Sequence, residues 1–168
     1  MIPPKPQFEA LADPESVLPI LEKISFLGGI TDEKRALIFQ HFQVAHFAKG
    51  AYIAKEGEEP SHLYIIQEGQ VELQITDRSV TVSKRSFHVG DCFGEAAMLS
   101  LINNTASFVA AEDCTLIMLS RRNLNKLRGE APDIFCQLMV NLARDLARKL
   151  QYTDMMLLKK QPGTPVEV

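Results

Sequence analysis

The chain has 168 residues, of which 46% are hydrophobic and 23% charged, a composition typical of one globular domain. The formal net charge of −3 argues against a nucleic-acid-binding surface, which is normally basic. No apolar run approaches the roughly 20 residues that span a bilayer, and no signal peptide is evident. We therefore expect a cytoplasmic protein without a membrane segment.

The N-terminal part predicts a flexible start followed by helices. Residues 1–14 are rich in proline and are expected to be poorly ordered. Residues 15–42 carry apolar side chains at helical spacing in two segments that Gly28-Gly29 separates. Thr31 is expected to cap the second helix. The whole of residues 15–130 is predicted to form one domain.

Short runs of β-branched and aromatic residues, broken by glycine, follow from Val44 to Leu119. Several of them alternate with period two, as strands do. The runs are Tyr52-Ile53, Leu63–Ile66, Val71–Ile75, Val80–Val82, Ser107–Val109 and Leu116–Leu119. Many short strands between turns predict an antiparallel β-roll or jelly roll, like the double-stranded β-helix of cupins. With the flanking helices, the fold class is α+β.

The helical period returns after the strands. Ser120 is expected to cap a short helix that ends near Leu127. Residues 131–158 then predict one long helix, with Pro132 in its first turn. Residues 159–168 predict a flexible tail. About ten residues after this helix are too few for a winged helix, so we expect no DNA binding in this chain.

The long helix carries a stripe of leucines at intervals of four, namely Leu138, Leu142, Leu146 and Leu150. A helix of this length is about 39 Å long, whereas a roll of about 100 residues has a radius of gyration of about 13 Å. Part of the stripe should therefore extend beyond the roll and need a partner. A second copy is the simplest partner, so this helix is predicted to form a homodimer.

Reactive side chains show no arrangement typical of catalysis or metal binding. The cysteines Cys92, Cys114 and Cys136 form no close pair, so free thiols are expected. The four histidines include no His-x-His pair, and no metal site is predicted. No nucleophile–base arrangement is evident, and the chain is not expected to be an enzyme.

Residues 90–107, which we call the cassette, are the most informative segment. The sequence Gly90-Asp91-Cys92-Phe93-Gly94-Glu95-Ala96-Ala97 places small residues around a glutamate at a predicted helix start. Small residues allow a ligand to approach the backbone, and free N–H groups at a helix start can bind an anion.

The cassette resembles the phosphate-binding cassette of cyclic-nucleotide-binding domains, whose pattern is Gly-Asp-x-Phe-Gly-Glu-x-Ala. The resemblance extends to Lys49-Gly50, Glu56-Gly57 and residues 63–71, and the long helix resembles that of the catabolite activator proteins. It implies a β-roll that binds cAMP or cGMP, with no other cofactor. It also implies that Glu95 holds the ribose 2′-hydroxyl and that the backbone of Gly94, Ala96 and Ala97 lines the phosphate cradle, with Thr105 beside it.

The sequence departs from the family pattern at two places. Asn104 stands where the family has an arginine for the phosphate, and a guanidinium–phosphate contact is about twice as strong as a neutral hydrogen bond. On the long helix, Lys149 and Leu150 stand where activator proteins place hydroxyl groups that cap the base. Lys84 and Arg85 lie on the strand before the cassette; either one of them points into the pocket as a replacement cation, or both lie on the surface. Leu73 and Phe93 are further candidates for the pocket wall.

Two functions therefore remain open. The chain is either a stand-alone regulatory module that senses cAMP, cGMP or a related small anion, or a degenerate domain that binds no nucleotide and serves as a dimeric protein-interaction scaffold. The ligand signals through the long helix in the first case, and an unknown protein is the partner in the second.

Overall fold

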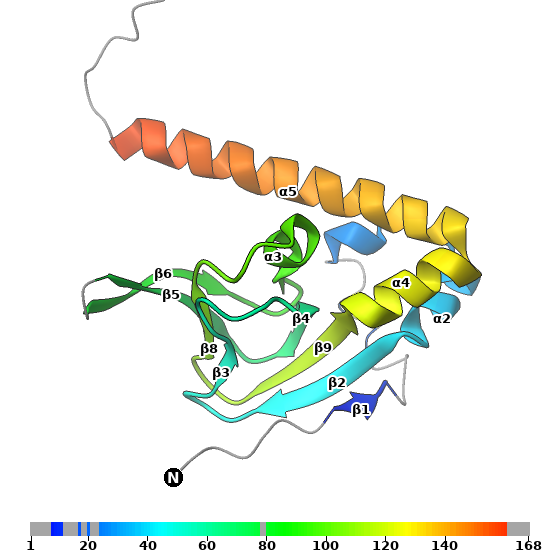
Figure 1. Cartoon of the computed structure of the whole chain (residues 1–168), viewed down its shortest axis with the longest axis horizontal. Coiled ribbons are helices and arrows are strands. Elements are labelled where there is room, and N and C mark those ends of the chain that lie inside the picture. Colours follow the sequence, from blue (N-terminus) through cyan, green and yellow to red (C-terminus); the bar gives the residue numbers. More distant parts are fainter. Residues whose placement is uncertain (1–7, 12–16, 18–19, 21–23, 78–79, 161–168) are drawn as a thin grey trace, which may run out of the picture.

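The computed structural model describes residues 8–11, 17, 20, 24–77 and 80–160, and its strands form two antiparallel sheets that fold into a roll (Figure 1). The first sheet has the order β1 (Glu9–Ala10), β2 (Phe42–Phe47), β9 (Cys114–Ser120), β4 (His62–Glu68) and β7 (Cys92–Phe93). The second has the order β3 (Tyr52–Ala54), β8 (Ser107–Ala110), β5 (Val71–Asp77) and β6 (Val80–Phe87). The predicted α+β roll is confirmed.

The central strands β4 and β9 are buried on both faces, which explains their uninterrupted apolar sequences. Alternate residues of β4 enter different cores. Leu63 and Ile65 belong to a core shared with the helices, whereas Tyr64 and Ile66 belong to the core inside the roll. The first sheet is therefore a wall between two hydrophobic cores.

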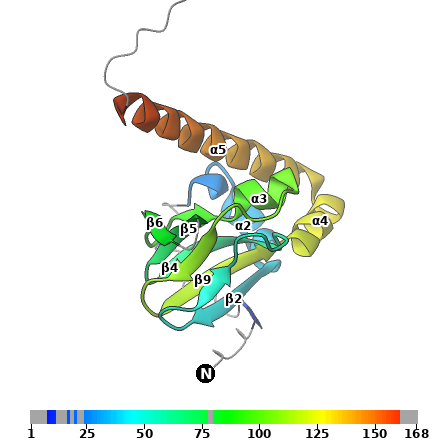
Figure 2. The same ribbon diagram turned by 60° about the vertical axis from the view of Figure 1, so that its left-hand side comes forward.

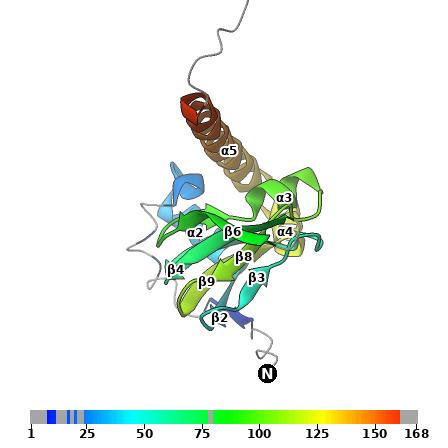
Figure 3. The ribbon, with the colours of Figure 1, turned by 90° about the vertical axis from the view of Figure 1, so that its left-hand side faces the viewer.

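Helices cover the outer face of this wall. They are η2 (Ser25–Leu27), α2 (Asp32–Phe39), α3 (Glu95–Ser100), α4 (Arg121–Glu130) and α5 (Pro132–Lys160). The N-terminal half of α5 packs on α4 and η2, and the helix then passes over α3 (Figure 1). Its C-terminal end rises away from the roll (Figures 2 and 3). None of the helices in the described part of the chain has an apolar stretch that could span a bilayer.

Several helices and terminal segments begin or end at residues other than those predicted. Residues 1–14 are not flexible throughout, because Glu9 and Ala10 form β1 and pair with β2. The helical region does not reach Phe42, which begins β2 and pairs with Leu119 of β9. α4 continues past Leu127 to Glu130, so Gly129 does not end it. Helix α5 also takes in the first two residues of the predicted tail, and residues 161–168 lie outside the described part.

The helix starts agree only in part with the predicted caps. Ser120 accepts a hydrogen bond from the Asn123 N–H and caps α4 as predicted. Thr31 occupies the N-cap position of α2, but its side chain makes no capping hydrogen bond. Much of the first predicted helix lies outside the described residues, although its apolar residues Val17 and Ile20 are buried.

Asn141 fixes the N-terminal half of α5 to the body of the domain. Its buried side-chain amide donates hydrogen bonds to the carbonyl oxygens of Phe26 and Gly28, at 2.9 and 2.8 Å. Leu138 and Leu142 on either side are buried in the helical core. These two leucines of the predicted stripe therefore contact their own domain, whereas Leu150 is 63% exposed.

We predict that Asn141→Ala lowers the free energy of unfolding by about 1–3 kcal/mol, because it removes the donor for two carbonyl groups. Urea denaturation measures this change. Gln137→Ala, which removes only a contact to Asn141, is the control and should cost less than about 0.5 kcal/mol. Equal losses in the two variants would contradict the anchoring role of Asn141.

Candidate functional site

The cassette turns sharply at Gly94, between β7 and α3. Gly94 has φ of 83°, and a Cβ atom there would lie 2.7 Å from the carbonyl oxygen of His62. Only glycine satisfies both the left-handed conformation and this close approach. The turn places Glu95 in the first position of α3, where it is 4% exposed.

A cavity of about 360 Å³ lies between the cassette, β5, β6, β8 and α5. This volume falls within the range of about 300–1,000 Å³ that small-molecule pockets have. Every site residue predicted from the sequence lines it: Leu73, Arg85, Phe93, Gly94, Glu95, Ala96, Ala97, Asn104, Thr105 and Lys149. The structure brings these residues together, and their contact with a ligand stays a prediction.

Aromatic side chains form one wall of the cavity. Phe93 stacks on Phe108 with ring centroids 4.6 Å apart, and Phe87 meets both rings at 5.6 and 5.8 Å. The sequence reasoning missed Phe87, Phe108, Ala106, Leu146 and Thr153 as lining residues. Phe108 could have been found, because it belongs to the predicted strand Ser107–Val109 and strand residues alternate between faces. Phe87 could not, because β6 extends beyond the predicted run Val80–Val82.

Arg85 is the cation nearest the aromatic wall in the described part of the cavity. It lies two residues before the buried Phe87 on β6, and its guanidinium carbon is 4.7 Å from the centre of the Phe87 ring. Residues two apart in a strand share a face, so Arg85 points toward the cavity. Arg85 lines the cavity and is at the same time exposed, so its role as a replacement cation stays a prediction.

Lys149 of α5 occupies the opposite wall, where it contacts the cassette directly. Its ammonium lies 2.6 Å from the Glu95 Oε1 atom and 2.8 Å from the Asp145 Oδ2 atom, and it donates a third hydrogen bond to the Cys92 carbonyl oxygen at 2.9 Å. The side chains of Glu95, Asp145 and Lys149 are 5%, 14% and 24% exposed. An ammonium has three donors, so Lys149 is fully paired.

Burial and neighbouring charges shift the pKa values of Lys149 and Cys92. Burial acts to lower the pKa of Lys149, but the charge of Glu95 and the hydrogen bonds to Asp145 and Glu95 outweigh it and raise this pKa. Burial and the nearby charge of Glu95 raise the pKa of the Cys92 thiol well above its usual value, which makes a structural thiol of it. Two carboxylates share one ammonium, so Lys149 leaves no positive charge for an anion.

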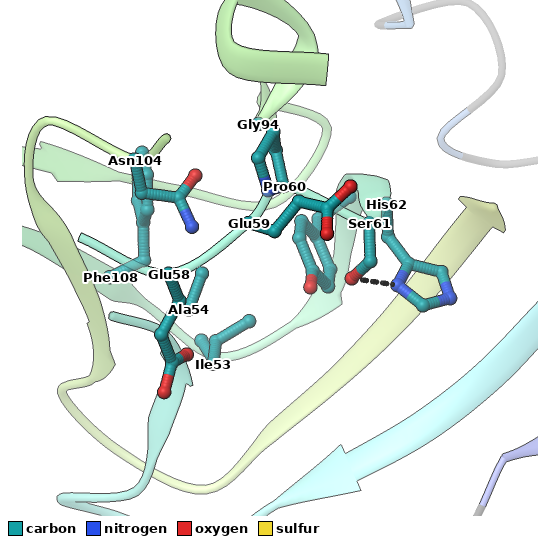
Figure 4. A pocket seen from close by; sticks show the side chains of 11 residues that line it. Ile53, Ala54, Glu58, Glu59, Pro60, Ser61, His62, Gly94, Asn104 and Phe108 are labelled. Carbon is teal, nitrogen blue, oxygen red and sulfur yellow. Dashed lines mark hydrogen bonds between the residues drawn. The ribbon is translucent and has the colours of Figure 1, made fainter. Parts of the chain in front are cut away.

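Asn104 presents its side-chain amide to the cavity. It is 7% exposed, and its backbone is fixed by hydrogen bonds with Gly57 and Glu58. Its side-chain amide forms no hydrogen bond with a described residue, and the amide atoms keep some access to solvent although the residue as a whole is buried. Asn104 also lines a second cavity of about 50 Å³, across from Ser61 and His62 (Figure 4). The free amide is therefore available to a ligand.

A serine and a histidine form a close polar pair at the second cavity. Ser61 and His62 share a hydrogen bond of 2.7 Å between the Ser61 Oγ and His62 Nδ1 atoms (Figure 4). Burial lowers the pKa of His62. No group of three or more His, Cys, Asp and Glu residues suited to a metal ion occurs in the part of the chain that was searched.

The comparisons with known proteins agree with this geometry. The family model for the cyclic nucleotide-binding domain matches residues 44–130, which is more than half of the chain. A cGMP-dependent protein kinase from Caenorhabditis briggsae is 26% identical over 155 residues, which cover 90% of this chain and 19% of that protein. The chain thus spans about a fifth of the length of the curated relatives it matches.

Two solved structures show the same fold. A cyclic nucleotide-binding domain from Methylobacillus flagellatus matches 90% of this chain and 86% of that chain, with a TM-score of 0.78 and 22% identity. The regulatory subunit of a cAMP-independent protein kinase A from Trypanosoma brucei, a triple mutant bound to cAMP, matches 80% of this chain and 50% of that chain, with a TM-score of 0.61 and 27% identity.

The family resemblance inferred from the cassette is thereby confirmed. The roll, the left-handed glycine before a buried glutamate, and the cavity between cassette and long helix all occur where the family pattern requires them. The chain belongs to the cyclic nucleotide-binding domain family.

Proposed function

We propose that the chain is a non-catalytic sensor module that binds a cyclic nucleotide or a related small anion in the cavity between the cassette and α5. The observation that carries this proposal is the cavity of about 360 Å³, at whose wall the Asn104 amide forms no hydrogen bond with a described residue. This amide can offer both a donor and an acceptor to a ligand.

Arg85 supplies the positive charge that the cassette lacks. With Lys149 paired to two carboxylates, Arg85 is the remaining cation on the described cavity wall. Its guanidinium lies over the Phe87 ring, and Arg85 and Asn104 line the same cavity. In this proposal Arg85 and Asn104 together take the place of the single arginine of the family.

One relative bears on the missing arginine. The cAMP-independent subunit from Trypanosoma brucei was solved with cAMP as a mutant in which one of the three substitutions replaces a threonine with arginine. In this chain, Asn104 stands at the arginine position of the family pattern and carries no charge. The native ligand of this chain is thus expected to be bound more weakly through its phosphate than in relatives that keep the arginine.

We predict that cAMP or cGMP binds weakly to the wild-type chain, and that Asn104→Arg increases the affinity roughly tenfold to a hundredfold, because it adds charge-assisted hydrogen bonds. Isothermal titration calorimetry measures both affinities. Arg85→Met should lower the wild-type affinity about tenfold, whereas Arg128→Met, which removes an exposed arginine of α4, should leave it unchanged.

The second function, a scaffold that binds no nucleotide, makes a different prediction. It requires that neither nucleotide binds at millimolar concentration to the wild-type chain or to Asn104→Arg. That result would exclude the sensor, because a competent pocket should recover binding once the arginine is present.

The sensor is further proposed to act as a homodimer through α5. Exposed residues of α5 recur at alternating intervals of three and four, as in the seam of a coiled coil. They are Cys136, Val140, Ala143, Ala147, Leu150, Asp154 and Leu157. This seam lies opposite the buried Leu138 and Leu142, so a second copy can pack there without displacing the roll.

We predict that Ala147→Glu abolishes the dimer, because it places two carboxylates face to face at the centre of the seam. Met155→Glu, which introduces the same charge at an exposed position off the seam, should leave the dimer intact. Sedimentation velocity at micromolar concentration distinguishes the two states. A wild-type chain that is monomeric, or an equal response of both variants, would contradict the proposed interface.

A further inference from the structure

The contact between Lys149 and Glu95 joins the two parts of the molecule that the sensor must couple. Glu95 belongs to the cassette and Lys149 to α5, 54 residues later, and their charged atoms are 2.6 Å apart. Both side chains are largely shielded from water. The pair therefore connects the ligand cavity with the helix that carries the proposed dimer seam.

Glu95 is also the group that a bound ligand would need. Under the proposed function, which this inference rests on, the Glu95 carboxylate accepts a hydrogen bond from a ligand hydroxyl. Its Oε1 atom already accepts one from Lys149, and its Oε2 atom faces the Cys92 thiol at 3.9 Å. A hydroxyl donor at Oε1 therefore competes with the ammonium for the same acceptor atom.

We propose that Lys149 is an internal competitor for the ligand hydroxyl at Glu95, so that ligand binding and docking of the C-terminal half of α5 are alternatives. The ammonium occupies the donor position while the cavity is empty. When a ligand hydroxyl takes that position, Lys149 loses one of its two carboxylate partners and keeps Asp145, which lies on its own helix, and the Cys92 carbonyl oxygen. Only this one neutral acceptor then holds the ammonium on the cassette, so Lys149 is held more weakly and can leave together with its helix.

The packing of α5 limits this release to its C-terminal half. Asn141 anchors the helix to Phe26 and Gly28, and Leu142 is buried in the helical core. Beyond Lys149, every side chain of α5 described up to Leu158 is exposed. Lys149 is thus the last side chain that holds α5 on the cassette, and losing its contact frees the segment that follows.

The first experiment tests the contact without any ligand, by hydrogen–deuterium exchange of the full chain. We expect Lys149→Met to increase exchange of the amides in residues 145–153 about tenfold, the effect of losing a charge-assisted hydrogen bond. Residues 134–141 should not change, because Asn141 still holds them. Arg148→Met, which removes the same charge from the neighbouring exposed position, is the control and should behave like the wild type.

Glu95→Gln is the second variant, in case Lys149→Met does not fold. It keeps the shape of the cassette and removes only the charge, so it should increase exchange in the same segment. If exchange is unchanged in whichever of the two variants folds, or if Arg148→Met changes it equally, Lys149 does not hold the helix and the proposal is wrong.

The second experiment measures competition by comparing cAMP with 2′-deoxy-cAMP, in the Asn104→Arg background. The ratio of the two dissociation constants reports the hydroxyl contact alone, because both ligands carry the same phosphate and base. Adding Lys149→Met should increase this ratio about tenfold, since Glu95 no longer has to release an ammonium before it accepts the hydroxyl. Adding Arg148→Met should leave the ratio unchanged.

The two experiments separate this inference from the proposed function. Absence of any nucleotide binding in Asn104→Arg would contradict the sensor, while the exchange measurement would still test the Lys149 contact. If nucleotides bind, but the ratio of the two dissociation constants is the same with and without Lys149, the sensor is supported and the proposed competition is overturned.

Discussion

A carboxylate that is shielded from water needs a counter-charge, and the arrangement of this domain depends on how Glu95 obtains one. The left-handed turn at Gly94 places Glu95 inside the protein, where no solvent can stabilise its charge. Lys149 provides the partner, and Asp145, one helical turn earlier, holds the lysine in place. This pairing joins α5 to the cassette, in addition to the contacts of Asn141, Leu138 and Leu142 that fix its N-terminal half.

The cavity differs from the family pattern in the distribution of its charge rather than in its shape. An arginine in the cassette would place the cation on the same loop as the glutamate. Here the unpaired positive charge on the described cavity wall is Arg85 on β6, since Lys149 on α5 is paired with two carboxylates, and the loop keeps a neutral amide at Asn104. A ligand in this cavity would therefore contact three separate elements, and its charge would be balanced from the side of the second sheet.

The roll and the cassette could be predicted because their signals are local. Glycine at corners, alternation in strands, and the pattern around Gly94 each depend on neighbouring residues. The pairing of Lys149 with Glu95 could not be predicted, because it depends on the rotation of a helix that begins far along the chain. The position of Arg85 lies between these cases. The sequence placed it on the strand before the cassette, but only the structure showed that it lines the cavity beside Phe87.

The wall formed by β4 and β9 has a consequence for how the molecule can change over evolution. Because alternate residues of these strands enter separate cores, the helical layer and the interior of the roll share a boundary but few side chains. Substitutions among the helices can accumulate without disturbing the packing around Phe93, and the reverse also holds. One layer can thus acquire new partners while the other retains its ligand, which gives the domain two surfaces for separate selection.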